Sequence, residues 1–306
     1  MSRLLAPLVA LGAYALIYLV SLFLLARDPG FAAEEYLAVL LIFGLGFSLA
    51  AWLSTIGIKA APVPVREPGK EFGLVMVFLL LFAIGFLGWG LSALKAATSA
   101  EQPQEVLTLM AKLAVMVAIP AWLFRRLGYR WRELFGSFRF DAGSVRVLII
   151  MALLLLAMQL LIGQGGKRVA ALDEPVWIIA LMALPALLWM SLEAGLTEEF
   201  LFRGLLQTRA AAFFRSELAA IVLMAVIFGL VHAPGYVLRG AHAMEGMGSA
   251  PSVLTAMAYT IVVVSPIGLM FGVLWARTRN LWLLVLLHGW TDLLPNLAPF
   301  IRTWLP

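Results

Sequence analysis

Three ionisable side chains, Glu198, Glu199 and Arg203, lie within six residues at the end of a long apolar run that begins near Val176. A charge at bilayer depth costs roughly 3 to more than 10 kcal/mol, so it is kept mainly where it pairs or acts. In a helix, Glu199 and Arg203 are four residues apart and can pair on one face. Glu198 points about 100° away from Glu199. The spacing predicts a paired, supporting carboxylate beside a freer, reactive one.

A second motif ends the next apolar run, where His232 follows Phe228 by one helical turn. If the chain makes a helical hairpin that turns near Arg215, Glu198 and His232 are each 17 residues from the turn. Residues equally distant from such a turn lie at a similar depth in two antiparallel helices. We therefore expect Glu198 and His232 to meet.

A third motif lies in the last apolar run, where His288 precedes Asp292 by four residues. This spacing places both side chains on one helical face. The remaining histidine, His242, lies in the Gly/Met-rich loop 235–250 and is interpreted as a solvated loop residue.

Together these residues could activate water for hydrolysis. Glu198 would take a proton from the water, and His232 would help to hold it. His288 and Asp292 would stabilise the charge that develops on a substrate carbonyl. The same four residues would be the ligands if a metal were bound, because two histidines with carboxylates are a known zinc-binding combination.

Each motif taken alone also has a structural interpretation. These are a buried ion pair for Glu199–Arg203, packing for Phe228, a helix-end position for His232, and a packing hydrogen bond or a proton relay for His288–Asp292. The three motifs occur in order with no competing fourth cluster. Their combination favours one shared site.

The elements that must position these residues are membrane helices. The mean hydropathy is +0.99, only 13% of residues are charged, and apolar runs of about 20 residues match the hydrocarbon thickness. The first run, Leu4–Ala26, is too long for a signal-peptide core, so it is interpreted as a retained span. We predict an all-α, polytopic transmembrane helical bundle of about eight to nine spans. The candidates are 4–26, 36–58, 72–94, 105–124, 147–163, 176–200 continuing to about 214, 218–234, 251–276 and 281–299.

Charge and composition exclude several classes of protein. The net charge of +5 does not indicate nucleic-acid binding, because the arginines lie in short loops between spans. With no cysteine, disulfides, thiolate metal sites and a cysteine nucleophile are excluded.

The positive residues favour a cytoplasmic N-terminus, with fourteen on the inner side and six on the outer side.

Polar residues at depth are concentrated in the second half of the chain. We expect residues 1–163 to be supporting helices, with a basic interfacial loop at 125–146, and residues 164–306 to be the catalytic core. Trp131, Phe135 and Phe138 suit a segment lying at the headgroups.

The three motifs resemble those of the CPBP family of intramembrane proteases, which includes CAAX proteases and bacteriocin-processing, Abi-like enzymes. The family motifs are EExxxR, FxxxH and HxxxN, and the resemblance covers about residues 176–296. It implies a peptidase acting on a membrane-associated peptide or protein, within a bilayer such as a bacterial inner membrane. It also implies a water-activating role for Glu198 with His232, an oxyanion role for His288 and residue 292, and a supporting role for Glu199 and Arg203.

Asp292 departs from this pattern, because better-known members carry asparagine there. An ionised aspartate cannot donate a hydrogen bond to an oxyanion, so Asp292 must be protonated, orient His288 or bind a metal. We favour the metal-free mechanism without a cofactor, with a zinc-dependent protease as the alternative.

Two rivals belong to other classes. One is a transporter or proton-coupled carrier that uses Glu198, Arg203 and His288 as a relay, and the other is a non-enzymatic, peptide-binding membrane scaffold. Carriers usually show paired halves with broken helices at matching positions, whereas the polar residues here lie in one half. Neither an HExxH nor a GxGD protease motif is present in the sequence.

Overall fold

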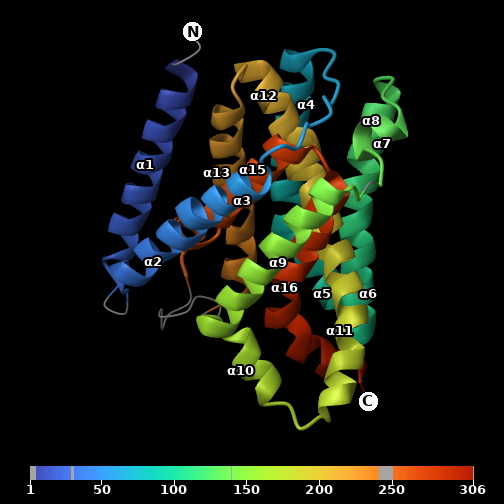
Figure 1. Ribbon diagram of the computed structural model, residues 1–306. Coiled ribbons are helices and arrows are strands. Elements are labelled where there is room, and N and C mark those ends of the chain that lie inside the picture. Colours follow the sequence, from blue (N-terminus) through green and yellow to red (C-terminus); the bar gives the residue numbers. More distant parts are fainter. Residues whose placement is uncertain (1–4, 29–30, 139, 241–250, 306) are drawn as a thin grey trace. The chain divides into compact units, whose positions relative to one another are not determined.

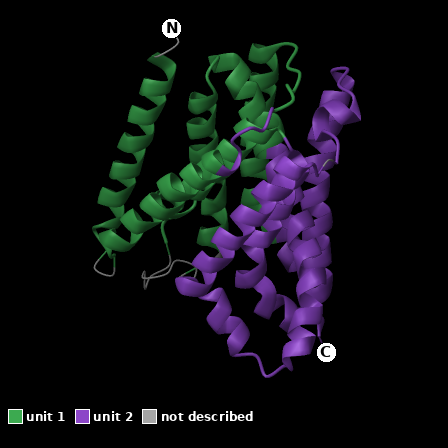
Figure 2. Cartoon of the chain, in the orientation of Figure 1, with its two compact units in different colours: residues 1–53, 60–92, 202–279 green, residues 54–59, 93–201, 280–306 purple. Residues whose placement is uncertain are grey.

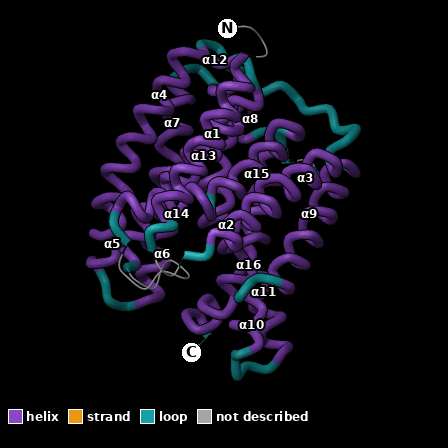
Figure 3. The backbone as a smooth tube through the Cα atoms, turned by 90° about the vertical axis from the view of Figure 1, so that its left-hand side faces the viewer, coloured by secondary structure: helices purple, strands orange, loops and turns teal. Residues whose placement is uncertain are grey.

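A computed structural model describes residues 5–28, 31–138, 140–240 and 251–305. Within these ranges the chain is helical, with turns and loops between helices and no strand (Figures 1 and 3). His242, which the sequence places in a solvated loop, lies outside the described residues. The all-α prediction is confirmed.

Among the described residues, eight helices are long and apolar enough to cross a membrane, or nine if one bent pair forms a single span. That pair is Val253–Val263 and Ser265–Thr278, which meet at 46°. Pro266 begins the second of these helices, where its missing N–H leaves no helical hydrogen bond unmade. The prediction of eight to nine spans is confirmed.

The chain divides into two compact units that alternate along the sequence (Figure 2). Unit 1 holds residues 1–53, 60–92 and 202–279, and unit 2 holds residues 54–59, 93–201 and 280–306. This grouping reflects packing and not function. The expected division into a supporting part before residue 164 and a catalytic part after it therefore stays a prediction.

In unit 1, α13 is the central helix, and it packs against α1, α12, α14 and α15. The α-helices of this unit are α1 (Leu5–Leu25), α2 (Ala33–Val39), α4 (Pro68–Leu81), α12 (Thr208–Phe214), α13 (Glu217–Arg239), α14 (Val253–Val263) and α15 (Ser265–Thr278). Its π-helical segments, in which the helix is widened, are η1 (Leu40–Phe47) and η2 (Phe82–Gly90). Three elements contain a border between the units: α3 (Ser48–Ser54), α5 (Leu91–Ala97) and η5 (Glu199–Gln207).

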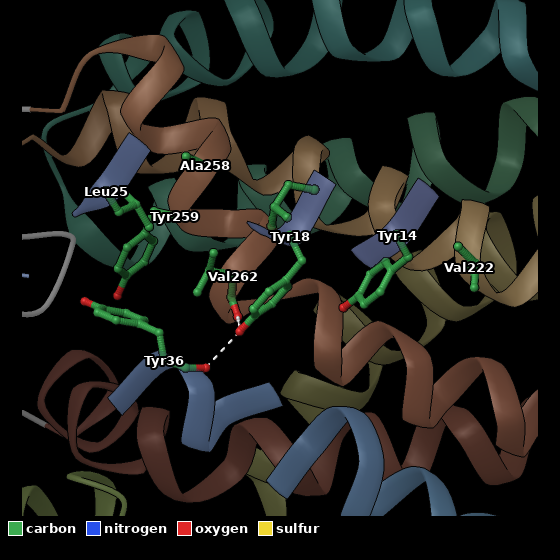
Figure 4. Packing of buried hydrophobic residues seen from close by; sticks show 9 residues of the cluster. Tyr14, Tyr18, Leu25, Tyr36, Val222, Ala258, Tyr259 and Val262 are labelled. Atoms are coloured by element: carbon green, nitrogen blue, oxygen red, sulfur yellow. Dashed lines mark hydrogen bonds between the residues drawn. The ribbon is translucent and has the colours of Figure 1, made fainter. Parts of the chain in front are cut away.

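The core of unit 1 includes tyrosines whose hydroxyl groups have partners. The Tyr14 hydroxyl lies 2.9 Å from the Ser265 hydroxyl. The Tyr18 hydroxyl donates to the Tyr36 carbonyl at 2.8 Å (Figure 4). A polar group in an apolar interior is costly unless it is hydrogen-bonded. These bonds let α1 bury polar rings against α14 and α15.

A buried ion pair joins α4 to α12 within unit 1. Arg209 Nε lies 3.3 Å from Glu71 Oε2, and Arg209 Nη1 donates to the Gly204 carbonyl at 2.8 Å. Glu71 also accepts hydrogen bonds from the backbone N–H groups of Arg66 and Glu67, just before the first turn of α4. The Arg209 side chain is buried in α12, within the helix that the sequence predicts to continue to about residue 214.

In unit 2, α16 is the central helix, and it packs against α9, α10, α11 and η4. The α-helices of this unit are α6 (Glu101–Lys112), α7 (Ile119–Arg126), α8 (Trp131–Phe135), α9 (Ala142–Leu161), α10 (Gly165–Ala170), α11 (Val176–Met190) and α16 (Leu281–Trp304). The π-helical segments are η3 (Leu113–Ala118) and η4 (Ser191–Leu196).

Candidate active site

Two glycines let η4 and α16 approach backbone to backbone. A Cβ atom at Gly195 would lie 2.4 Å from the Val285 carbonyl oxygen, and one at Gly289 would lie 2.2 Å from the Ser191 hydroxyl. Small residues allow this close approach of membrane helices. The contact brings the residue beside Gly289, His288, next to the segment that carries the paired glutamates.

His288 lies among three carboxylates of unit 2. Its Nδ1 atom is 2.6 Å from Glu199 Oε1, which is a short hydrogen bond. Its Nε2 atom is 3.7 Å from Glu198 Oε2 and 3.6 Å from Asp292 Oδ2. An ionised carboxylate only accepts hydrogen bonds, so Nδ1 donates to Glu199 and Nε2 is directed toward the other two groups. The predicted helical pairing of His288 with Asp292 is present at ion-pair distance.

The three carboxylates differ in their access to the surroundings. The Glu199 side chain is fully buried, whereas 14% of the Glu198 side chain and 31% of the Asp292 side chain are exposed. Glu199 can therefore orient the imidazole, and Glu198 and Asp292 are the groups that water or substrate can reach. The expected division between a supporting and a reactive glutamate stays a prediction.

Within residues 5–28, 31–138, 140–240 and 251–305, no group of three or more histidine, aspartate or glutamate side chains is spaced to hold a metal ion. One nitrogen of His288 already bonds to Glu199. The metal ligands that the sequence suggests are divided between the two units, with His232 in unit 1 and Glu198, His288 and Asp292 in unit 2. The zinc-dependent alternative therefore stays a prediction, and no step is derived through a metal.

A second charged pair, Lys112 and Glu193, lies beside this cluster in unit 2. Lys112 Nζ donates a hydrogen bond to Glu193 Oε1, and the ammonium also attracts Glu198 and Asp292 electrostatically. The signal that could have revealed the pair is the presence of two charged residues inside apolar runs.

Arg203 lies in unit 1 and is fully buried. Its guanidinium carbon is 4.2 Å from the centre of the Phe228 ring and 5.3 Å from that of Phe271. A cation over an aromatic face is attracted by the negative face of the ring. Phe228 thus has an electrostatic role beside the packing role that the sequence suggested.

His232 is held one turn after Phe228 on α13. Its Nδ1 atom lies 2.6 Å from the Phe228 carbonyl oxygen, and the two rings meet edge to face with centres 4.7 Å apart. A carbonyl only accepts, so Nδ1 carries a proton and Nε2 is left as the acceptor of the neutral ring. This tautomer suits a histidine that holds a water molecule.

The structure thus brings the predicted residues together in two sets. Glu198, Glu199, His288 and Asp292 form one set in unit 2, and Arg203, Phe228 and His232 form the other in unit 1. The hydrogen bond between Glu199 and His288 was not predicted, because the sequence assigned Glu199 to Arg203. The expected pairing of Glu199 with Arg203, and of Glu198 with His232, stays a prediction.

Comparison with known families supports the resemblance seen in the motifs. Residues 180–294 match the family described as Rce1-like, type II CAAX prenyl endopeptidase. The matched range contains all seven predicted site residues and leaves out Lys112. Searches of curated proteins and of solved structures found no match. The match indicates a peptidase.

Proposed function

We propose that the chain is an intramembrane endopeptidase with Glu198 as the base that activates water, because residues 180–294 match the family described as Rce1-like, type II CAAX prenyl endopeptidase. The observation that carries this proposal is the placement of His288, whose Nδ1 bonds to Glu199 while Nε2 lies 3.7 Å from Glu198. The family match favours the peptidase over a carrier or a peptide-binding scaffold.

The proposed reaction begins when Glu198 takes a proton from water and the resulting hydroxide attacks the peptide carbonyl carbon. The carbonyl π bond opens, and its electron pair becomes an oxyanion on the tetrahedral intermediate. When the C–N bond breaks, the leaving amine receives the proton from Glu198, so the carboxylate is restored. His232, named by the FxxxH motif, is proposed to hold the water through Nε2.

His288 is proposed to stabilise the oxyanion through Nε2–H in its protonated form. Glu199 keeps the ring in place by accepting from Nδ1–H at 2.6 Å. Asp292 is the second carboxylate facing Nε2, at 3.6 Å, and we assign it to orientation of the ring, because an ionised aspartate donates no hydrogen bond. This arrangement places donors where negative charge develops.

The proposed substrate is a membrane-associated protein or peptide, and the family name suggests a prenylated C-terminal CAAX sequence. The test uses purified protein in liposomes and two fluorogenic CAAX peptides, one farnesylated and one without the lipid. Cleavage of the farnesylated peptide alone would identify the prenyl group as part of recognition. Cleavage of both would assign recognition to the peptide.

The decisive variant is Glu198→Gln, which keeps the size of the side chain and removes the base. Turnover should fall by about 100-fold or more, with an unchanged thermal unfolding midpoint. The matched control is Glu35→Gln, which changes an exposed glutamate on α2. Wild-type turnover in the Glu198→Gln variant would overturn the proposed base. Comparing the proteomes of membranes that carry either form would then identify natural substrates.

A further inference from the structure

Lys112 is a charged residue in the middle of a membrane span. It ends α6, and the candidate span that contains it runs from Glu101 to Arg126. Lysine at bilayer depth is rare and usually marks a functional residue, because its transfer into hydrocarbon is costly. The three motifs of the proposed protease do not include it.

The Lys112 ammonium is held in place by Glu193 on η4. Nζ donates to Glu193 Oε1, and about a fifth of each side chain is exposed, 22% for Lys112 and 19% for Glu193. The pair is therefore neither sealed inside the protein nor free at its surface. Because both side chains are partly accessible, their charges can interact with a group that binds next to them.

The ammonium lies close to the candidate active site through the packing of its helix. Lys112 ends α6, which packs against η4, the segment that carries Glu193, and against α16, the helix that carries His288 and Asp292. Glu193, bonded to Lys112, precedes Glu198 by five residues, so the ammonium is positioned to attract Glu198 and Asp292 as well as Glu193. Negative charges gathered in a medium of low dielectric constant repel strongly unless a cation offsets them.

We propose that Lys112 is a positioning residue of the active site, and that its positive charge offsets Asp292 and Glu198 as negative charge develops on the substrate. The inference rests on the proposed peptidase function. An ionised Asp292 beside His288 would repel the oxyanion that His288 stabilises. The ammonium reduces that repulsion without touching the substrate, so it acts through Asp292 and Glu198.

A purely structural tie between α6 and η4 is the competing explanation. Both elements have other attachments within unit 2. Gln102 at the start of α6 donates to the Thr303 carbonyl at 2.8 Å, and the Thr303 hydroxyl donates to Glu101 at 2.9 Å. The glycine contacts hold η4 against α16. Loss of the Lys112–Glu193 bond should thus leave the helices in place.

Two variants separate the explanations, because each breaks the ion pair and only one removes the cation. Lys112→Met removes the charge, whereas Glu193→Gln leaves the ammonium and a hydrogen-bond acceptor. We expect Lys112→Met to lower kcat for the farnesylated CAAX peptide by about 10- to 100-fold, with KM within about twofold. Glu193→Gln should keep kcat within about threefold of wild type, and Lys112→Arg should restore most of the activity.

The control is Lys95→Met, which removes an exposed lysine of unit 2 and should change neither constant. Equal losses of kcat in Lys112→Met and Glu193→Gln, or wild-type kcat in Lys112→Met, would overturn the proposal. So would a Lys112→Arg variant as inactive as Lys112→Met but normally folded. Wild-type turnover in the Glu198→Gln variant would instead overturn the proposed base, and absence of any cleavage by the wild-type protein would overturn the proposed function. The two failures are therefore distinguishable.

Discussion

His288 and Glu199 are 89 residues apart in the sequence, and a 2.6 Å hydrogen bond joins Nδ1 of the imidazole to Oε1 of the carboxylate. The bond is buried, so no solvent competes for either atom. It decides which ring nitrogen faces Glu198. The direction in which Nε2 of His288 points thus depends on Glu199.

Replacing Glu199 should damage catalysis in proportion to the loss of this acceptor. Glu199→Gln still offers an oxygen to Nδ1–H and should keep part of the activity. Glu199→Ala leaves a buried donor without its partner, which costs about 1–3 kcal/mol of folding free energy. We expect turnover to fall further in the alanine variant than in the glutamine variant. Enzyme kinetics measure the turnover of the two variants, and thermal unfolding measures their stability. Equal turnover of Glu199→Gln and Glu199→Ala would refute the role of Glu199 in orienting His288.

The close contact of η4 with α16 leaves no room for a methyl group. Gly289→Ala would place Cβ 2.2 Å from the Ser191 hydroxyl and 2.8 Å from the Ser191 backbone. The helices must then separate, and we expect a loss of about 1–3 kcal/mol in stability together with lower turnover. Gly12→Ala on α1 is the control, because no atom lies within 4 Å of its Cβ position. Normal stability and turnover in Gly289→Ala would show that this contact is not required.

The stacking of Arg203 over Phe228 predicts that lysine is a poor substitute. Lysine carries the charge but lacks the planar group that covers the ring. Arg203→Lys should lower the unfolding midpoint, with a loss of about 1–2 kcal/mol. Arg126→Lys tests the same type of contact at an exposed position, since Arg126 lies 5.4 Å from the Trp122 ring centre, and it should change little. An equal fall of the unfolding midpoint in Arg203→Lys and Arg126→Lys would show that the buried contact of Arg203 with Phe228 stabilises the protein no more than an exposed contact does.

Asp292 and Lys112 should be coupled in function. Asp292→Asn removes the negative charge that we propose Lys112 offsets, and it supplies an amide donor. The loss caused by Lys112→Met should therefore be at least about threefold smaller in the Asp292→Asn background than in the wild type. A double-mutant cycle on kcat measures this difference. Independent, multiplicative effects would contradict the proposed action through Asp292.

Metal dependence is tested by removing metal. The purified protein should keep its turnover of the farnesylated peptide after dialysis against EDTA and 1,10-phenanthroline, because the proposed base and oxyanion groups are side chains. Elemental analysis on the same sample measures residual zinc. Loss of activity that zinc restores, and that magnesium does not, would favour the metalloprotease alternative.

The spans were predictable from the sequence because hydropathy and length reflect the bilayer directly. The π-helical segments η4 and η5 could not be predicted, because their widening has no periodic signature in apolar runs. The shift in register that they introduce alters which side chains meet.

The candidate site was partly predictable for a similar reason. Local spacing identified His288 with Asp292 and Phe228 with His232, since four residues make one helical turn. The bonds of Glu199 to His288 and of Lys112 to Glu193 join distant parts of the chain. Such contacts depend on how the helices pack against one another, and the spacing of residues within one helix does not predict this packing.

The buried pair of Glu71 and Arg209 has a consequence for biosynthesis. The two residues are 138 positions apart, and both side chains are buried in the folded protein. When the ribosome has made only α4, Glu71 lacks its cationic partner, and it gains that partner after more than a hundred further residues have been synthesised. Unit 1 therefore cannot complete its packing during synthesis until α12 has been made. Its first membrane helices must wait in the bilayer, incompletely assembled, for α12 to arrive.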